Sequence, residues 1–231
     1  MRAVKTLVVV PAFDEAASVV EVVRRVTAVG YPVLVVDDGS TDSTASLAQS
    51  AGATVMRLPV NLGVGAAMRA GFRYSVANGY HRVVQVDADL QHPPEAIHLL
   101  IAAADEGAQL VIGSRFAAGY RVSGYRRVAM ATVAGVISRM VGVTLDDVTS
   151  GFRVISEPLL SQFAERYPAE YLGDTVEAVL QAHAGGATIA QVPVPMEPRT
   201  AGASTSRLAA SGHLARLAVS VVAGKPKEMA K

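Results

Sequence analysis

Short runs of apolar residues alternate along the chain with longer segments in which apolar residues recur every three or four positions. Strands are expected where these runs are rich in β-branched residues: 6–10, 33–36, 54–58, 83–86, 109–112 and 189–194. Helices are expected at about 19–29, 43–51, 64–78, 94–106, 128–141, 157–165 and 175–184. Pro11 is expected to end the first strand. The alternation predicts an α/β fold with buried parallel strands.

The apolar run 83–86 ends in two aspartates, Asp87 and Asp89, one residue apart. Open α/β sheets bind their ligands at the carboxyl ends of such strands. Two carboxylates this close repel each other, and a divalent cation such as Mg²⁺ relieves the repulsion while binding substrate phosphates. An isolated Asp-x-Asp is more often an acidic turn, so the rest of the chain has to decide between a turn and a site.

A second strand, 33–36, also ends in acids, Asp37 and Asp38. Two strands that deliver carboxylates to one edge of a sheet favour a ligand site over an ordinary turn. The segment 61–67 contains Gly63 and Gly65 and looks like a phosphate loop, but Met68 replaces the third glycine and no Lys-Ser/Thr follows. We expect these small residues to let the helix pack closely on the strand that carries Asp87.

Composition narrows the class of protein. The 231 residues are 51% hydrophobic and 18% charged, which suits one large domain, and the formal net charge of +1 does not indicate a nucleic-acid partner. The absence of cysteine excludes disulfides, thiolate nucleophiles and cysteine-based zinc sites. No apolar run approaches the roughly 20 residues of a membrane span. We therefore expect a cytoplasmic protein.

The second half of the chain adds basic and polar segments. Arginines gather between Gly119 and Arg127, and a polar loop runs from Asp146 to Arg153. Residues 207–222 have the pattern of an amphipathic helix, which we expect to be a packing or homo-oligomer face rather than a membrane anchor. The five histidines show no metal-binding spacing, and His92 is at most a neighbour of the Asp-x-Asp loop.

Taken together, these segments resemble family 2 glycosyltransferases, and within them the dolichol-phosphate-mannose-synthase-like branch. The resemblance is carried, in the family's order, by residues 11–15, 37–40, 61–67, 87–91, 113–115, 149–153 and 199–204. It implies a GT-A fold, with a mixed, mostly parallel sheet flanked by helices, over residues 1–206, and leaves 207–231 as the C-terminal helix and tail. It also implies a nucleoside-diphosphate sugar as donor, Mg²⁺ or Mn²⁺ as cofactor, and a polyprenyl-phosphate or glycan acceptor. A lipid acceptor implies peripheral contact with the inner face of the cell membrane.

The resemblance assigns roles to individual residues. The nucleotide would be bound by Pro11, Phe13, Glu15, Asp37, Asp38, Gly65, Asp87, Gln91, Arg199 and Ser204; the metal by Asp89 with Gln91; and the acceptor by Arg115, Arg126, Arg127 and Ser150. Arginine suits both phosphates because its planar guanidinium binds oxyanions in a bidentate manner. Residues 204–207 differ from the Ser-Lys that mannose-transferring relatives often carry, so the donor base and sugar stay open.

Family members mostly invert the anomeric centre in a single displacement, and we expect inversion here. A hydroxyl acceptor needs a general base, for which Asp147, Asp174 and Glu177 are the candidates, while Arg115 and Asp89 would act on the phosphates. Asp174 also fits a helix N-cap and Glu177 a solvent-exposed helix position. A phosphate acceptor is already an anion and needs no base, which leaves Asp147 structural.

Three other functions are weighed against this one. A haloacid-dehalogenase-type phosphatase needs Asp-x-Asp-x-Thr on its first strand, but here Gln91 stands at the threonine position and the motif is in mid-chain. A sugar nucleotidyltransferase needs a glycine-rich basic segment where residues 11–13 read Pro-Ala-Phe. A non-catalytic nucleotide-sugar-binding subunit stays open as the main alternative.

Overall fold

The computed structural model describes residues 4–115, 124–168 and 173–197, with the side chains of 124–129, 173 and 174 left out. These residues form a sheet with the strand order β3-β2-β1-β4-β6-β5-β7. The strands are β1 (Thr6–Ala12), β2 (Val33–Asp37), β3 (Thr54–Arg57), β4 (Arg82–Gln85), β5 (Leu110–Ser114), β6 (Arg153–Ser156) and β7 (Ile189–Pro193). Only β6 runs antiparallel to its neighbours, β4 and β5. The prediction of a mixed, mostly parallel sheet is confirmed.

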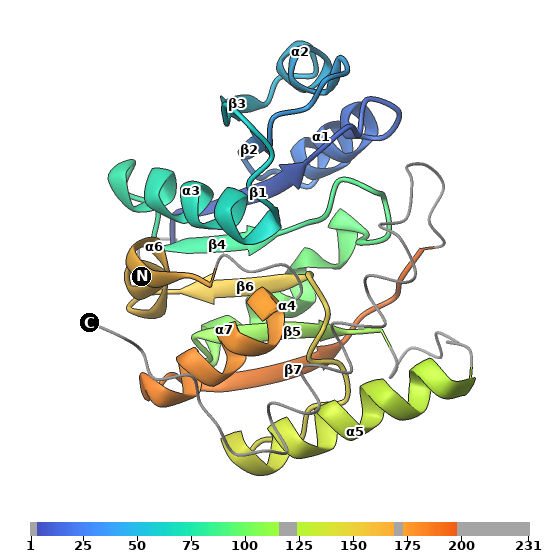
Figure 1. Cartoon of the computed structure of the whole chain (residues 1–231). Coiled ribbons are helices and arrows are strands. Elements are labelled where there is room, and N and C mark those ends of the chain that lie inside the picture. Colours follow the sequence, from blue (N-terminus) through green and yellow to red (C-terminus); the bar gives the residue numbers. More distant parts are fainter. Residues whose placement is uncertain (1–3, 116–123, 169–172, 198–231) are drawn as a thin grey trace.

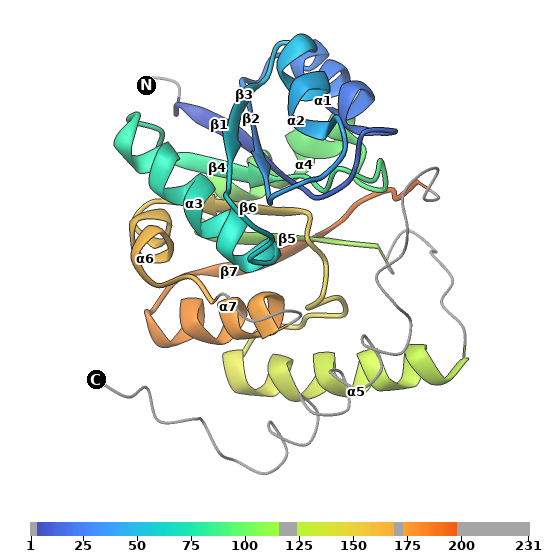
Figure 2. The same cartoon turned by 45° about the horizontal axis from the view of Figure 1, so that its top comes forward.

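Helices cover both faces of the sheet (Figures 1 and 2). They are α1 (Val19–Ala28), α2 (Thr44–Ser50), α3 (Val64–Ala77), α4 (Ile97–Asp105), α5 (Gly124–Val141), α6 (Leu159–Arg166) and α7 (Gly173–Ala184), with a 3-10 turn, η1 (Pro94–Ala96), ahead of α4. Alternate residues of the strands point to opposite faces. Leu7 and Val9 join one core with α3, α5, α6 and α7, whereas Val8 and Val10 join another with α1, α2 and α4. This alternation explains why the central strands are apolar at nearly every position.

The expected end of the first strand at Pro11 is wrong, because β1 continues to Ala12. Pro11 pairs in register with Val36 of β2. The polar groups of Val9, two residues earlier, face β4, where its carbonyl accepts from the N–H of Val86. The backbone of Pro11 faces the same side, where β4 has already ended at Gln85. The absence of an N–H in proline therefore costs no hydrogen bond of the sheet.

The close packing expected of the small residues 61–67 on the strand that carries Asp87 stays a prediction, but a glycine further along α3 lies directly against another strand. A β-carbon on Gly71 would lie 2.6 Å from Cγ1 of Val9, so at this residue the helix lies directly against β1. The helix still packs over the centre of the sheet, next to the strands whose ends carry the acids.

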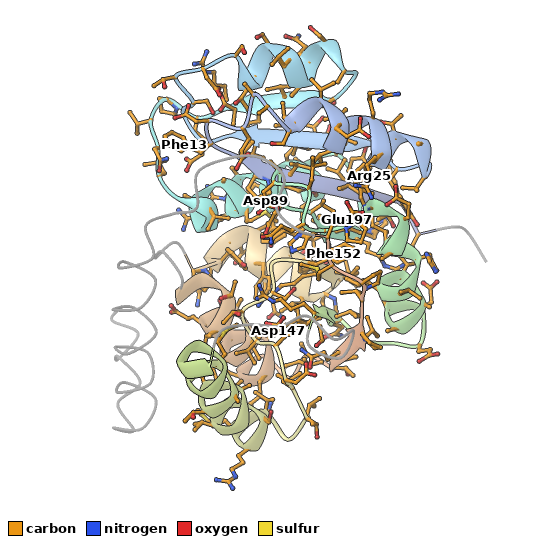
Figure 3. The ribbon with its side chains drawn as sticks, turned by 90° about the vertical axis from the view of Figure 1, so that its right-hand side faces the viewer. Phe13, Arg25, Asp89, Asp147, Phe152 and Glu197 are labelled. Carbon is orange, nitrogen blue, oxygen red and sulfur yellow. The ribbon has the colours of Figure 1, made fainter. Side chains whose placement is uncertain are left out.

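One edge of the sheet carries the acids that were predicted at the ends of the strands. The carboxyl ends of the parallel strands meet there, and so does the amino end of the antiparallel β6. Figure 3 looks onto this edge, with Asp89 and Phe152 near its middle, Phe13 towards one side and Asp147 towards the other. Among the described residues, no helix is long and apolar enough to cross a membrane.

Candidate active site

The end of β2 places two buried carboxylates at this edge. Asp38 is 4% exposed, and its two oxygens accept the backbone N–H groups of Leu62 and Gly63, each at 2.8 Å. Burial raises the pKa of Asp38, against the lowering effect of these two bonds, and the nearby charge of Asp37 raises it further. Asp38 thus holds the 61–63 loop against the end of β2.

Asp37 is fully buried, and its Oδ1 accepts the N–H of Ser40 at 3.1 Å. Its Oδ2 lies 3.2 Å from Nε of Arg57, an exposed side chain, but without the alignment of a hydrogen bond. Within the described part of the chain this oxygen has no hydrogen-bond donor. A buried carboxylate oxygen in this situation is suited to accept a hydrogen bond from a bound ligand.

The loop after β1 is interlocked with the loop after β2. Asp14 donates its N–H to Oγ of Ser40 and accepts the N–H of Thr41, at 2.9 and 2.8 Å. Asp14 has a φ of 52°, a left-handed conformation that aspartate adopts more readily than most residues. Its neighbour Phe13 is 43% exposed, which is unusual for a large aromatic side chain. Glu15 lies further in, and its carboxylate accepts the hydroxyl of Ser18 at 2.9 Å.

The Asp-x-Asp loop follows β4. Asp89 is 8% exposed, and its Oδ1 accepts the N–H of Gln91 at 3.0 Å. Between them, Leu90 has a φ of 65°, which is strained for a bulky residue. Asp87 is more open, and its Oδ1 accepts from Nε2 of Gln85 at 3.3 Å. The backbone therefore folds tightly around one of the two carboxylates and leaves the other at the surface.

The turn before β6 closes this loop from the far side. Gly151 lies directly against the carboxylate of Asp87. Ser150, expected to bind the acceptor, is 1% exposed, and its hydroxyl accepts the N–H of Phe152 at 3.3 Å. Arg153 is equally buried and donates to three backbone carbonyls, of Val148, Ser150 and Thr175. These contacts give Ser150 a role in shaping the turn and do not favour direct contact with an acceptor.

Arg115 and Asp147 form a bidentate ion pair at the end of β5. Nε of Arg115 lies 2.6 Å from Oδ2 of Asp147 and Nη2 lies 3.1 Å from Oδ1, while Thr149 also donates its hydroxyl to Oδ1. The Asp147 side chain is completely buried, and that of Arg115 is 22% exposed. The general-base role expected of Asp147 is not favoured, because both of its oxygens are occupied and neither reaches the surface.

A cluster that the sequence did not indicate lies beside the Asp-x-Asp loop. Arg25 of α1 binds the carboxylates of both Glu95 and Glu197, with four N–O distances of 2.6–3.1 Å. Glu197 also donates its N–H to the carbonyl of Gln91 at 3.1 Å. Figure 3 shows Arg25 and Glu197 together, a short way from Asp89. The segment that ends at Glu197 is thus fastened to the loop that carries Asp89.

Several predicted residues lie outside what the structure describes. These are Arg199, Ser204, the side chains of Arg126, Arg127 and Asp174, and the whole of 207–231. Gly65 is buried in the first turn of α3. Glu177 is exposed on α7. Among the described acids, Asp87 and Asp89 lie in the loop after β4, and Asp37 and Asp38 lie at the end of β2.

The sheet order, with carboxylates at the ends of β2 and β4, is that of the GT-A fold class. The chain belongs to glycosyl transferase family 2, whose model matches residues 7–162. It is 32% identical to a polyprenol monophosphomannose synthase of Mycolicibacterium smegmatis over 212 residues, which cover 87% of this chain and 80% of that one.

The chain is also similar to a second curated relative and, in its fold, to a solved structure. An undecaprenyl-phosphate 4-deoxy-4-formamido-L-arabinose transferase of Salmonella dublin is 33% identical over 68% of this chain, which spans half of that protein. The fold is similar to that of glucosyl-3-phosphoglycerate synthase from Mycobacterium tuberculosis, solved with Mn²⁺, uridine diphosphate and glucosyl-3-phosphoglycerate. That match has a TM-score of 0.74 at 23% identity and covers 97% of this chain and 81% of the other. The chain is a glycosyltransferase.

Proposed function

We propose that this protein is a metal-dependent, inverting glycosyltransferase that moves a sugar from a nucleoside-diphosphate sugar to a polyprenyl phosphate. The observation that carries the proposal is the placement of Asp87 and Asp89 just beyond β4, at the same edge of the sheet as Asp37 at the end of β2, with β1 between the two strands. The acceptor class is supported by two relatives whose names contain a polyprenol or undecaprenyl phosphate. A lipid acceptor places the reaction at a membrane surface.

The donor set at the Asp-x-Asp loop fits a hard divalent cation. Asp89 and Asp87 would hold Mg²⁺ or Mn²⁺ together with the side-chain amide oxygen of Gln91. No group of three or more His, Asp or Glu side chains able to hold a metal occurs in the described part of the chain. When bound there, the cation would supply positive charge that neutralises the leaving nucleoside diphosphate.

The nucleoside would lie between the loops that follow β1 and β2. The exposed ring of Phe13 offers a surface for stacking a base. Oδ2 of Asp37, which has no hydrogen-bond donor within the described part of the chain, accepts a hydrogen bond from the base or ribose. Asp38 keeps the 61–63 loop in place at the end of the same strand. Burial of one such bond between a neutral group and a carboxylate is typically worth about 1.5–3 kcal/mol.

The acceptor phosphate would approach from the side of Arg115. The ion pair with Asp147 fixes the guanidinium in one orientation, and Nη2 also donates to Thr149 at 2.9 Å. A phosphate oxygen attacks the anomeric carbon of the sugar as the bond to the nucleoside diphosphate breaks, which inverts that carbon. The nucleophile is already an anion, so the step needs no proton acceptor and agrees with the occupied oxygens of Asp147.

A ligand-binding panel tests the donor and the metal together. We would measure the melting temperature of the protein with UDP, GDP, CDP or dTDP, each with and without Mn²⁺, for the wild type, Asp89→Ala and Glu106→Ala. Glu106 is an exposed acid at the end of α4, on the opposite edge of the sheet, and serves as the matched control. One diphosphate should raise the melting temperature only with Mn²⁺ in the wild type and Glu106→Ala, and not in Asp89→Ala.

The acceptor is tested by transfer of labelled sugar from the donor so identified. We expect product with undecaprenyl phosphate in detergent and none with soluble glycans. Transfer to glycans alone would replace the acceptor in the proposal. Metal-dependent binding without transfer to either acceptor would support the alternative, a nucleotide-sugar-binding subunit that acts through a partner. No response to any diphosphate would refute the proposed donor site.

A further inference from the structure

His92 is the residue directly after the Asp-x-Asp-x-Gln segment, and it is buried among groups that surround Asp87. Its side chain is 4% exposed. The imidazole ring stacks on the ring of Phe152, with centroids 5.1 Å apart and planes inclined by 12°. Its Nδ1 accepts the backbone N–H of Asp87 at 3.0 Å. His92 therefore contacts the backbone of Asp87 and also Phe152, whose neighbour Gly151 faces the carboxylate of Asp87.

The hydrogen bond to the backbone determines the tautomer of the ring. A backbone N–H can only donate, so Nδ1 is an acceptor and the neutral ring carries its proton on Nε2. The 3.6 Å separation of Nδ1 from Oδ2 of Asp87 is therefore a contact between two acceptors and not an ion pair. His92 acts on Asp87 through the main chain rather than by charge.

The hydrogen bond between His92 and Asp87 lies where the chain leaves the sheet after β4. The N–H of Val86 still belongs to the ladder and donates to the carbonyl of Val9 in β1. Asp87 is the next residue, and its N–H is taken by His92 instead of by a neighbouring strand. From this point the backbone turns away through Ala88 and Asp89 to the strained Leu90. The loop thus leaves the sheet at the residue whose N–H is bonded by the His92 side chain and not by the carbonyl of a neighbouring strand.

We propose that His92 is a positioning residue for the metal and diphosphate site. Its Nδ1 accepts the N–H of Asp87 and so fixes the backbone there, which holds the two aspartates in one arrangement before a ligand binds. This inference rests on the proposed function of the Asp-x-Asp loop. A histidine with only a packing role would support the stability of the fold without affecting the affinity for metal.

Two substitutions separate the acceptor from the ring. In His92→Asn the side-chain oxygen is attached to Cγ, as Nδ1 is in histidine, so the acceptor for Asp87 remains while the ring is lost. In His92→Phe the ring can still stack on Phe152, but the acceptor is lost and the N–H of Asp87 stays buried without a partner. A packing role predicts that His92→Asn is the more damaging change, whereas a positioning role predicts the reverse for metal binding.

The readouts are the Mn²⁺ concentration for half-maximal stabilisation by the bound nucleoside diphosphate, together with kcat and KM. We expect His92→Phe to raise this concentration and lower kcat by about tenfold or more, as the loss of a group that orients metal ligands commonly does, and His92→Asn to stay within about threefold of the wild type. Equal effects of both substitutions on metal affinity would overturn the proposal, and so would a larger effect of His92→Asn.

Amide hydrogen exchange of the free protein tests the bond without any ligand. The N–H of Asp87 should exchange about as slowly in His92→Asn as in the wild type, and at least about tenfold faster in His92→Phe. Equal protection in all three proteins would overturn the role of His92 even if nucleotides bind. A wild type that binds no nucleotide would refute the proposed function, while the exchange rates would still decide whether His92 fixes Asp87.

Discussion

Gly151 faces the carboxylate of Asp87 so closely that a β-carbon at this position would lie 2.8 Å from Oδ2 and 2.9 Å from Oδ1. Contacts this short do not occur, so a larger residue has to displace the carboxylate. The Asp87 side chain is 37% exposed and can turn towards water at little cost. We predict that Gly151→Ala lowers kcat/KM by roughly tenfold to a hundredfold, because small displacements of reacting groups are costly, and changes stability by less than about 1 kcal/mol.

Gly135 provides the matched control for this substitution. It is exposed within α5, and a β-carbon there would have no atom within 4 Å. Gly135→Ala should leave kcat/KM unchanged and raise the free energy of unfolding by about 0.5–1 kcal/mol, since alanine favours a helix interior. Steady-state kinetics and urea unfolding measure both variants. Equal activity of the two would mean that the position of Asp87 is not critical.

The ion pair between Arg115 and Asp147 leads to a prediction about stability. Asp147→Ala removes a fully buried partner and leaves a guanidinium that is only 22% exposed. Breaking a buried pair in this way typically costs 3–5 kcal/mol, and the route of Arg115 to water places the expected loss at the lower end, about 3 kcal/mol. Urea unfolding measures this loss, and Glu106→Ala should show almost none.

The same pair distinguishes a supporting role from a catalytic one. If Asp147 orients Arg115, the loss of activity in Asp147→Ala should appear mainly as a higher KM for the acceptor, with the pH dependence of kcat unchanged. A general base would instead show a low kcat at unchanged KM, and the acidic limb of its pH profile would disappear. The second pattern would restore the catalytic role expected of Asp147 from the sequence.

The strands and the acids at their ends were predictable because both are local patterns. Valine-rich runs define β2 and β4; Asp37 ends β2 and Asp38 follows it, while Asp87 and Asp89 lie just beyond β4. Contacts between distant segments leave no such local signal. His92 stacks on a residue 60 positions away, and Arg25 pairs with Glu197, 172 positions away. Pro11 illustrates the converse case, in which a valid local rule is overridden because the neighbouring strand ends first.

Glu95 provides a pH test of the cluster beside the Asp-x-Asp loop. Its hydrogen bonds with Arg25 lower its pKa below the ordinary value of 4.5. A carboxyl with a depressed pKa in the folded state contributes stability above its ordinary pKa and loses it as the pH falls through the folded value. The unfolding free energy of the wild type should therefore exceed that of Glu95→Gln near pH 6, and the difference should shrink below pH 4.5. The difference is expected to be under about 1 kcal/mol, because Glu95 is 55% exposed.

Arg25→Gln gives the functional counterpart of this measurement. It releases Glu197, whose N–H donates to the carbonyl of Gln91, from its carboxylate partner. We expect a severalfold weaker response to Mn²⁺ with nucleotide, and no further loss when Glu95→Gln is added, because both changes break the same cluster. Additive losses would show that the two residues act separately. Addition of 1 M salt should reduce the effect, as for other pairs near the surface.

Asp38 should show the opposite dependence on pH. Burial raises its pKa above the ordinary value of 3.8, despite its bonds to the N–H groups of Leu62 and Gly63. Between the ordinary and the raised value the folded state binds more protons than the unfolded state, so stability falls as the pH rises through this window. Asp38→Asn does not titrate, and its amide nitrogen cannot accept a hydrogen bond from one of the two backbone N–H groups. The variant should therefore be less stable than the wild type at every pH.

The advantage of the wild type in unfolding free energy should be largest near pH 4, decrease as the pH rises and become constant above the folded pKa. Urea unfolding at a series of pH values measures it. An advantage that grows with pH would mean that the two N–H bonds outweigh burial, and that the 61–63 loop is held chiefly by the charge of Asp38.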